Sequence, residues 1–286
     1  MIGYLYILMF TALQQGESAT VRHYARRHGS GGMLMNAITA LFSALFFLLT
    51  DTNGFYAPRG MIPLAVINAF LYAAGFYLSF LAYRIGPFGL TKILSGFSMV
   101  FTIFYGILFL HEPASFVTYI AIALVFIAMA LAGYQKAGDD EKNASLKWFF
   151  VVIGSVVANG FIGILTKMQQ LRFDNACSNE FQFISIGGSC LLLAVLGTVL
   201  DRDKLPTVLK TGVPYGLLAG LCNGGKNFLT ILIYAVLPLS IVTPTKSVLG
   251  KLASLAMALF VYKERYTKRQ IAGVILGAVA AIMLVL

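Results

Sequence analysis

The stretch "IPLAVINAFLYAAGFYLSFLAYRIGP", residues 62–87, is matched 151 positions later by "VPYGLLAGLCNGGKNFLTILIYAVLP", residues 213–238. At this shift the prolines near both ends coincide, and small residues coincide at four-residue steps between them. The coincident pairs are Pro63 and Pro214, Ala65 and Gly216, Ala69 and Gly220, Ala73 and Gly224, Ala74 and Gly225, Tyr83 and Tyr234, and Pro87 and Pro238. Small residues are common in membrane helices generally, but that composition does not predict coincident prolines. We therefore interpret the two stretches as copies of one internal repeat.

Flanking blocks extend the repeat at slightly different shifts. A shift of 152 pairs Glu112 with Glu264, and a shift of 144 pairs "QG" at residues 15–16 with "NG" at residues 159–160. The differences between shifts indicate short insertions or deletions between the blocks. The repeat therefore extends over most of the chain.

A polar segment separates the two copies. "QKAGDDEKNASLK", residues 135–147, is charged and contains Gly and Ser, which is typical of a linker. It divides the chain into a first half, residues 1–134, and a second half, residues 148–286.

The composition is that of a membrane protein. Of 286 residues, 59% are hydrophobic and only 11% are charged, against about 25% charged in soluble domains, and the mean hydropathy is +0.83. Many apolar runs approach the ~20 residues needed to cross the hydrocarbon core. We predict an all-α integral membrane protein with ten transmembrane helices, near residues 2–21, 33–50, 61–83, 87–110, 115–134, 148–167, 181–200, 212–234, 238–262 and 267–286. The first run lacks the basic start and cleavage site of a signal peptide, so we expect a retained helix.

Five helices per half is an odd number, which determines how the halves are oriented. The second half must enter the membrane from the side opposite to the first, so the repeat is predicted to have inverted topology. This architecture is characteristic of secondary transporters, whose sites lie near the midplane at the interface between the repeats.

Loop charges predict the orientation. Of 21 Lys and Arg residues, four lie inside predicted helices, and fourteen of the other seventeen fall on one side. Only Arg59, Lys167 and Arg172 fall on the other. The positive-inside rule then places the linker in the cytoplasm and both termini outside it, in a multi-pass protein of the cell (inner) membrane. The net charge of +10 is accordingly interpreted as a topology signal, and nucleic acid is not an expected partner.

Several segments resemble a known family. "AYRIGPFGLTKIL" (82–94) and "FYGILFLHEPASFVTYIAIALVFIAMALAG" (104–133) are similar to the fourth and fifth helices of EamA-type members of the drug/metabolite transporter superfamily. "IYAVLPLSIVTPTKSVLGKLASLAMALFVYKERYTKRQIAGVILGAVAAIM" (233–283) resembles helices nine and ten. "QQGESATVR" (14–22) and "ANGFIGILTK" (158–167) resemble the Trp-Gly motif that opens each half, with Gln15 and Asn159 in place of the Trp.

The resemblance implies a central cavity lined by the first, third, fourth, sixth, eighth and ninth helices. The fifth and tenth would form the outer scaffold. "SVLGK" (247–251) is also similar to the helix-nine stretch in which the related sugar-phosphate and nucleotide-sugar translocators carry a phosphate-binding lysine, with Lys251 at that position. Only Leu249 and Lys251 match that stretch, so an organophosphate substrate is one option among the small metabolites that the superfamily moves.

Four lysines inside predicted helices need an explanation, because a lysine in hydrocarbon costs roughly 3 to more than 10 kcal/mol. They are Lys92, Lys226, Lys246 and Lys251. We expect a wet cavity and an anionic substrate group to accommodate at least one; snorkelling to an interface or pairing with an acid is the alternative. Lys246 and Lys251 are five residues apart, about 140° around a helix, so they cannot share one face. Pro244 is predicted to break or kink their helix and to aim a new helix start at an anion.

Glu17 is the acid placed to balance these lysines, either as a structural counter-ion or as a proton carrier. Asn223 and Asn227 on the eighth helix, with Tyr72 and Phe76 at the corresponding positions of the third, are added as neighbouring residues. Interfacial or core packing is the alternative for the tyrosine. The predicted substrate-binding residues are Gln15, Glu17, Tyr72, Lys92, Asn159, Asn223, Lys226, Asn227, Lys246 and Lys251. Glu112 and Glu264 are expected to be exposed loop charges that end the fourth and ninth helices.

Enzyme signatures are absent from the sequence. It contains no HExxH, GxSxG or GxxxxGK[ST], and its three histidines are isolated. Cys177, Cys190 and Cys222 form no CxxC and are expected to be packing residues. We therefore predict no enzymatic activity and no catalytic residue, metal or cofactor.

The sequence thus predicts a secondary active transporter of a small polar metabolite that carries a carboxylate or phosphate, amino acids included, working by alternating access. The expected partners are the substrate, the lipid bilayer and either a coupling proton or a counter-substrate, for a monomer or a homodimer. One alternative is a proton-coupled exporter of cationic compounds that uses Glu17, which the like charge of the lysines disfavours. Another is a non-transporting membrane protein, such as a lipid-handling enzyme or a structural subunit.

Overall fold

A computed structural model of the chain describes residues 2–50, 54–109, 111, 115–133, 146–173, 177–236 and 239–283. Helices account for nearly all of these residues, and the described part contains no strand. The α-helices are α1 (Ile2–His28), α2 (Gly32–Thr50), α3 (Ile62–Ile85), α4 (Phe88–Ser95), α5 (Met99–Phe109), α6 (Phe116–Gly133), α7 (Leu146–Arg172), α8 (Ser178–Leu200), α9 (Leu205–Thr207), α10 (Val213–Val236), α11 (Leu239–Ala256) and α12 (Lys268–Met283).

A helix occupies each of the ten predicted windows, but two windows contain irregular turns. The window 87–110 is divided into α4 and α5 by a 3₁₀ turn at Gly96–Ser98. The window 238–262 begins with α11 and ends in a π-helical turn at Met257–Val261. Of the break or kink predicted at Pro244, the break and the new helix start are wrong, because α11 runs through this position as one helix. The kink stays a prediction. Membrane helices tolerate an internal proline when neighbouring groups satisfy the freed carbonyl.

Length and composition support a membrane location. Within the described residues, five helical segments are long and apolar enough to cross a bilayer, at Gly32–Thr50, Ile62–Ile85, Phe88–Phe109, Leu146–Arg172 and Ser178–Leu200. Large apolar side chains lie exposed on the outside of the bundle, as in Leu49, Phe116 and Phe260. These are the features of an all-α membrane protein. Most of the predicted linker, residues 135–145, lies outside the described residues, whereas residues 146 and 147 begin α7.

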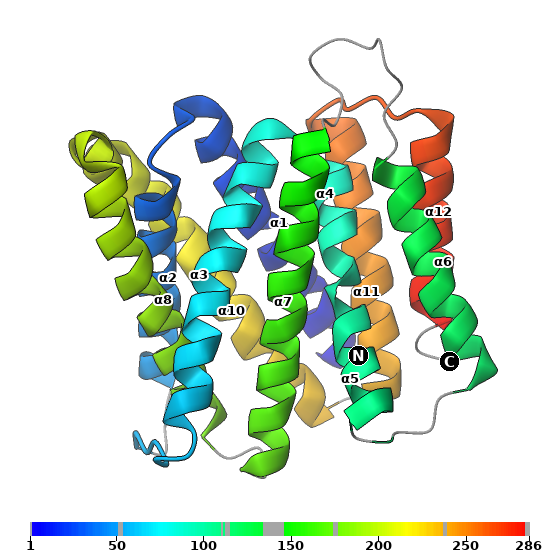
Figure 1. Ribbon diagram of the computed structural model, residues 1–286, viewed down its shortest axis with the longest axis horizontal. Coiled ribbons are helices and arrows are strands. Elements are labelled where there is room, and N and C mark those ends of the chain that lie inside the picture. The colour runs from blue at the N-terminus through cyan, green and yellow to red at the C-terminus, as the bar shows by residue number, and fades with distance from the viewer. Residues whose placement is uncertain are drawn as a thin grey trace.

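The helices form a bundle (Figure 1), and several of their pairwise contacts match one another under the predicted repeat. The contact between α1 and α10 corresponds to the contact between α7 and α3. The contact between α2 and α10 corresponds to the contact between α8 and α3. In addition, α2 packs against its counterpart α8, and α6 packs against its counterpart α12. Exchanging the halves therefore leaves the pattern of these contacts unchanged.

The contact between α2 and α10 depends on glycine. Gly216, Gly220 and Gly224 of α10 face α2, where a β-carbon on Gly220 would lie 2.7 Å from the Thr39 carbonyl oxygen and 2.6 Å from the β-carbon of Phe42. Both distances are shorter than van der Waals contact. The four-residue glycine spacing therefore sets how closely these two helices approach.

Candidate functional site

A cavity of about 460 Å³ lies inside the bundle. Its walls come from α1, α3, α4, α7, α10 and α11, together with the 3₁₀ turn after α4. These are the six helices that the family resemblance implied, in sequence order the first, third, fourth, sixth, eighth and ninth windows. The described lining includes no residue of α6 or α12, which pack against each other at one edge of the bundle (Figure 1).

Nine of the ten predicted site residues line this cavity. They are Glu17, Tyr72, Lys92, Asn159, Asn223, Lys226, Asn227, Lys246 and Lys251. Gln15 does not, because its amide nitrogen donates to the Gly250 carbonyl at 3.1 Å and to Ser254 Oγ at 3.0 Å. Its neighbour Gln14 faces the cavity instead. The rotation of α1 about its axis turns Gln15 toward α11 and Gln14 toward the cavity, so the predicted placement of Gln15 in the cavity wall is wrong.

Glu17 and Lys226 form an ion pair in the cavity wall, joining α1 to α10. The second carboxylate oxygen of Glu17 accepts a hydrogen bond from Asn223 Nδ2 at 2.7 Å. Asn223 Oδ1 in turn accepts from Ser43 Oγ of α2 at 2.7 Å and from Asn227 Nδ2 at 3.2 Å. Both oxygens of Glu17 are therefore engaged by donors, which is the arrangement of a counter-ion.

Lys92 reaches across the cavity wall from α4 to α1. Its Nζ donates to Ser18 Oγ at 2.5 Å, one residue beyond Glu17. The ammonium group thus points at a neighbouring helix inside the bundle. The ammonium group therefore makes a hydrogen bond within the protein.

Lys246 and Lys251 point to different neighbours, as their spacing on α11 predicted. Lys246 Nζ lies 3.8 Å from the centre of the Phe10 ring, and Phe10 itself lines the cavity. Lys251 Nζ lies 4.9 Å from the Phe97 ring and donates to the Gly277 carbonyl of α12 at 3.3 Å. A cation over an aromatic face is favourable in each case. The Lys251 ammonium group, however, is held toward the outer helix α12.

The remaining predicted polar residues are held by local contacts. Asn159 Nδ2 donates to the Ser155 carbonyl of its own helix at 2.7 Å. Tyr72 Oη donates to Gln182 Oε1 of α8 at 2.8 Å. Both side chains reach the cavity wall, and their fixed positions give the wall a defined shape.

The sequence reasoning missed a set of hydroxyl groups in the wall. They belong to Ser18, Ser79, Tyr83, Ser95, Ser98 and Ser254. Ser18 could have been predicted from the sequence, because it follows Gln14 by one helical turn and lies on the same face of the helix. Ser79 and Tyr83 lie one turn apart on α3, and the other serines lie on different segments; a single hydroxyl in an apolar helix is not distinguishable from a packing residue by sequence. Within the described residues, no group of three His, Cys, Asp or Glu side chains has the geometry of a metal site.

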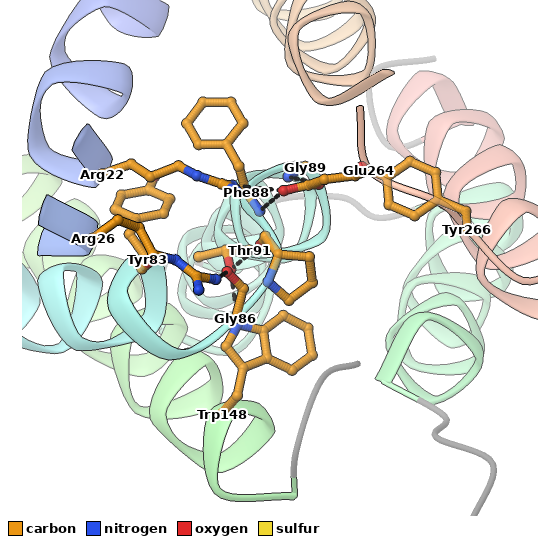
Figure 2. A network of polar contacts seen from close by, with 11 residues as sticks. Arg22, Arg26, Tyr83, Gly86, Phe88, Gly89, Thr91, Trp148, Glu264 and Tyr266 are labelled. Atoms are coloured by element: carbon orange, nitrogen blue, oxygen red, sulfur yellow. Dashed lines mark hydrogen bonds and ion pairs between the residues drawn. The ribbon is translucent and has the colours of Figure 1, made fainter. Parts of the chain in front are cut away.

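A second polar network surrounds Glu264 (Figure 2). Its carboxylate accepts hydrogen bonds from the backbone nitrogens of Phe88 and Gly89, from Arg22 Nη1 at 2.6 Å and from Tyr266 Oη at 3.0 Å. The predicted exposure of Glu264 is therefore wrong, since its side chain is only 10% exposed. The segment after α11 folds over the start of α4, whose unpaired backbone N–H groups need an acceptor. Glu112, which the predicted repeat pairs with Glu264, lies outside the described residues.

The same network includes two arginines of α1. The Arg22 guanidinium lies 4.0 Å from the Tyr262 ring centre, and Arg26 donates to the carbonyls of Tyr83 at 3.2 Å and Gly86 at 2.7 Å. Burial, together with the adjacent Glu264 carboxylate, raises the pKa of the Tyr266 phenol, so it remains a donor at neutral pH. We call the set Arg22, Arg26, Gly86, Phe88, Gly89, Glu264 and Tyr266 the Glu264 clamp.

Comparison with known proteins adds support for the fold alone. No family model and no curated protein sequence matches the chain. A solved structure described as "Crystal structure of protein" is similar over 98% of this chain and 96% of its own, with a TM-score of 0.50 and 15% sequence identity. The arrangement of helices therefore has a counterpart of the same length among solved structures.

Proposed function

We propose that this chain is a secondary active transporter of a small anionic metabolite. The observation that carries the proposal is the charge of the cavity wall. Four lysines line it, and the only carboxylate among its described lining residues, Glu17, is already paired with Lys226. The described lining therefore contains more lysines than carboxylates, and its formal charge is positive.

This charge excess favours an anionic ligand. Buried cations are costly unless an anion or hydrogen-bond acceptors compensate them, and a carboxylate or phosphate of a substrate supplies both. The cavity volume of about 460 Å³ lies within the range of about 300–1,000 Å³ typical of small-molecule sites. Amino acids and other small carboxylates or phosphates fit these two conditions.

The transport mechanism follows from inverted symmetry. We propose ten membrane-spanning helices in two halves, residues 1–134 and 148–286, joined by a cytoplasmic linker, with both termini outside the cytoplasm of a cell (inner) membrane. The exchange-symmetric packing of α1, α3, α7 and α10 supports two equivalent halves. In Figure 1, α1 begins and α12 ends toward the same end of the bundle, as an even number of crossings requires. Alternating access then arises when the halves change their mutual tilt around the cavity.

The EamA-type resemblance agrees with this proposal. The six helices implied to surround the central cavity are those that line it here. A cation exporter that uses Glu17 is less compatible with this wall, because both oxygens of Glu17 are engaged and the surrounding lysines would repel a cation. Either a proton or a counter-substrate would supply the coupling.

A binding screen tests the charge of the substrate. Purified protein is heated with pools of carboxylates, phosphates and cationic compounds, and the shift in melting temperature is measured. We expect stabilisation by one or more anions and none by cations, because ligand binding to the native state raises the apparent stability. Stabilisation by cations alone, followed by their uptake into proteoliposomes, would replace this proposal with the exporter alternative.

A further inference from the structure

The cavity ends where the Glu264 clamp begins. On α1 the last lining residue is Val21, and Arg22 follows it directly. On α3 the last lining residue is Tyr83, whose carbonyl accepts the hydrogen bond from Arg26. On α4 the first lining residue is Lys92, one helical turn after the amides that bind Glu264. Three walls of the cavity therefore pass into the clamp within about one turn.

The clamp joins the two halves of the chain. Arg22, Arg26 and the turn from Gly86 to Gly89 belong to the first half, whereas Glu264 belongs to the second. In Figure 2 the Glu264 carboxylate lies between the Arg22 guanidinium and the start of α4, while Tyr266 approaches it from the other side. Removing this one carboxylate would leave Arg22 and two backbone amides without their shared acceptor.

The polar nature of the clamp distinguishes it from the packed core. Its central pair, Arg22 and Glu264, is only 11% and 10% exposed, so the contact is made by charged and polar groups that are largely shielded by the protein. Hydrogen bonds to charged groups can be exchanged for water when two surfaces separate, whereas opening an apolar core exposes surface with no such compensation. A contact of this kind suits a boundary that opens and closes.

We infer that the Glu264 clamp is a gate that closes the cavity on the side of the positively charged loops, and that it must open for ligand to pass there. This inference rests on the proposed transport function, since it assigns a gate to the same cavity. Glu264 acts as a positioning residue: it holds Arg22 of α1 and the start of α4 against the segment between α11 and α12.

Thiol accessibility measures the state of this gate. Ser95 lines the cavity, and its hydroxyl bonds to the Thr91 carbonyl of its own helix, so Ser95→Cys leaves contacts between helices intact. The reporter is placed in a background in which Cys177, Cys190 and Cys222 are replaced by alanine. A membrane-impermeant maleimide is then applied to inside-out and right-side-out vesicles separately.

Glu264→Gln in this background should raise the labelling rate from the clamp side at least about fivefold, because the closed state loses its charge-assisted hydrogen bonds. Labelling from the opposite side should fall or stay constant. Arg22→Lys, which keeps the charge but loses the planar geometry, should give a smaller increase. Glu180→Gln is the matched control, since Glu180, at the start of α8, is also buried but accepts its hydrogen bond from the Tyr56 backbone nitrogen, outside the clamp.

A second Arg22 variant, Arg22→Gln, removes the positive charge of the pair and should raise the labelling rate as Glu264→Gln does. An unchanged rate in both Glu264→Gln and Arg22→Gln, or an equal rise in Glu180→Gln, would overturn the gate proposal. If Glu264→Gln does not fold, as judged by gel filtration, the two Arg22 variants decide the question by the same readout. Labelling requires no substrate, so the outcome is separable from the transport proposal. If no anion stabilises the protein but Glu264→Gln still increases labelling, the anionic substrate is ruled out and the gate remains supported.

Discussion

Lys226 of α10 and Glu17 of α1 form an ion pair across 209 positions of sequence, in the wall of the central cavity. The pair joins the two halves of the chain and neutralises one of the four lysines in the wall. Asn223 and Ser43 continue the contact to α2. Its consequences can be measured independently of any substrate.

We expect Glu17→Gln and Lys226→Met each to lower the free energy of unfolding by about 3–5 kcal/mol, because each leaves the other charge buried without its partner. The double variant should recover most of that loss. Melting temperatures of all four proteins, read as a double-mutant cycle, check the coupling. Additive losses would show that the pair contributes no interaction energy.

Glu17→Gln also separates the counter-ion from a proton carrier. A counter-ion predicts that proton-driven uptake and counterflow exchange fall together, because the wall itself is disturbed. Proteoliposome assays of both modes check this. Loss of proton-driven uptake with intact exchange would instead assign Glu17 the proton.

Lys246 and Lys251 should differ in their effect on ligand binding. The Lys246 ammonium lies over Phe10 in the cavity wall, whereas the Lys251 ammonium is bonded to the Gly277 carbonyl of α12. We expect Lys246→Met to weaken binding of the anion found in the screen roughly 30-fold or more, and Lys251→Met to weaken it less than about threefold. Isothermal titration calorimetry measures both. The reverse order would make Lys251 the anion site, as the helix-nine resemblance implied.

Gly220→Ala should destabilise the contact between α2 and α10. The added methyl group would meet the Thr39 carbonyl oxygen, part of the backbone, which cannot rotate away. We expect a loss of about 1–3 kcal/mol, typical of overpacking. Gly187→Ala is the control, because its nearest neighbour is the Ala44 β-carbon at 3.9 Å and alanine favours helix. Equal melting temperatures for the two variants would contradict the close approach.

Trp148 reports on the region beside the clamp. It is the single tryptophan of the chain, is fully buried, and donates from Nε1 to Thr91 Oγ1 at 2.8 Å. Glu264→Gln should shift its fluorescence to longer wavelength and increase quenching by acrylamide, because opening would admit water next to α4. An unshifted spectrum together with increased Ser95→Cys labelling would place the opening elsewhere along the cavity.

Reporter fusions test the topology. We expect the 135–147 segment in the cytoplasm and the C-terminus outside it, since fourteen loop lysines and arginines gather on one side. Phosphatase and fluorescent-protein fusions after residues 140 and 286 distinguish the two compartments. A cytoplasmic C-terminus would rule out ten crossings with this orientation.

The sequence by itself determined the helices and which of them carry polar residues toward the interior. Backbone groups in lipid must be satisfied within each segment, so an apolar window of about 20 residues has few alternatives to a helix. A lysine inside such a window needs a partner, so Lys92, Lys226, Lys246 and Lys251 could be singled out before any contact was known. The coincidence of prolines and small residues at one shift also led the sequence to predict a repeat that relates the halves.

Only the tertiary structure decided the partners of those side chains. Gln15 turned toward α11 while Gln14 faced the cavity, although the two are adjacent, because the rotation of α1 depends on the helices packed around it. Glu264 has the local sequence of an exposed loop, yet the start of α4, about 175 positions earlier in the chain, buries it. Hydropathy and local spacing describe one segment at a time. These contacts join segments far apart in sequence, so their geometry exists only once the helices have packed.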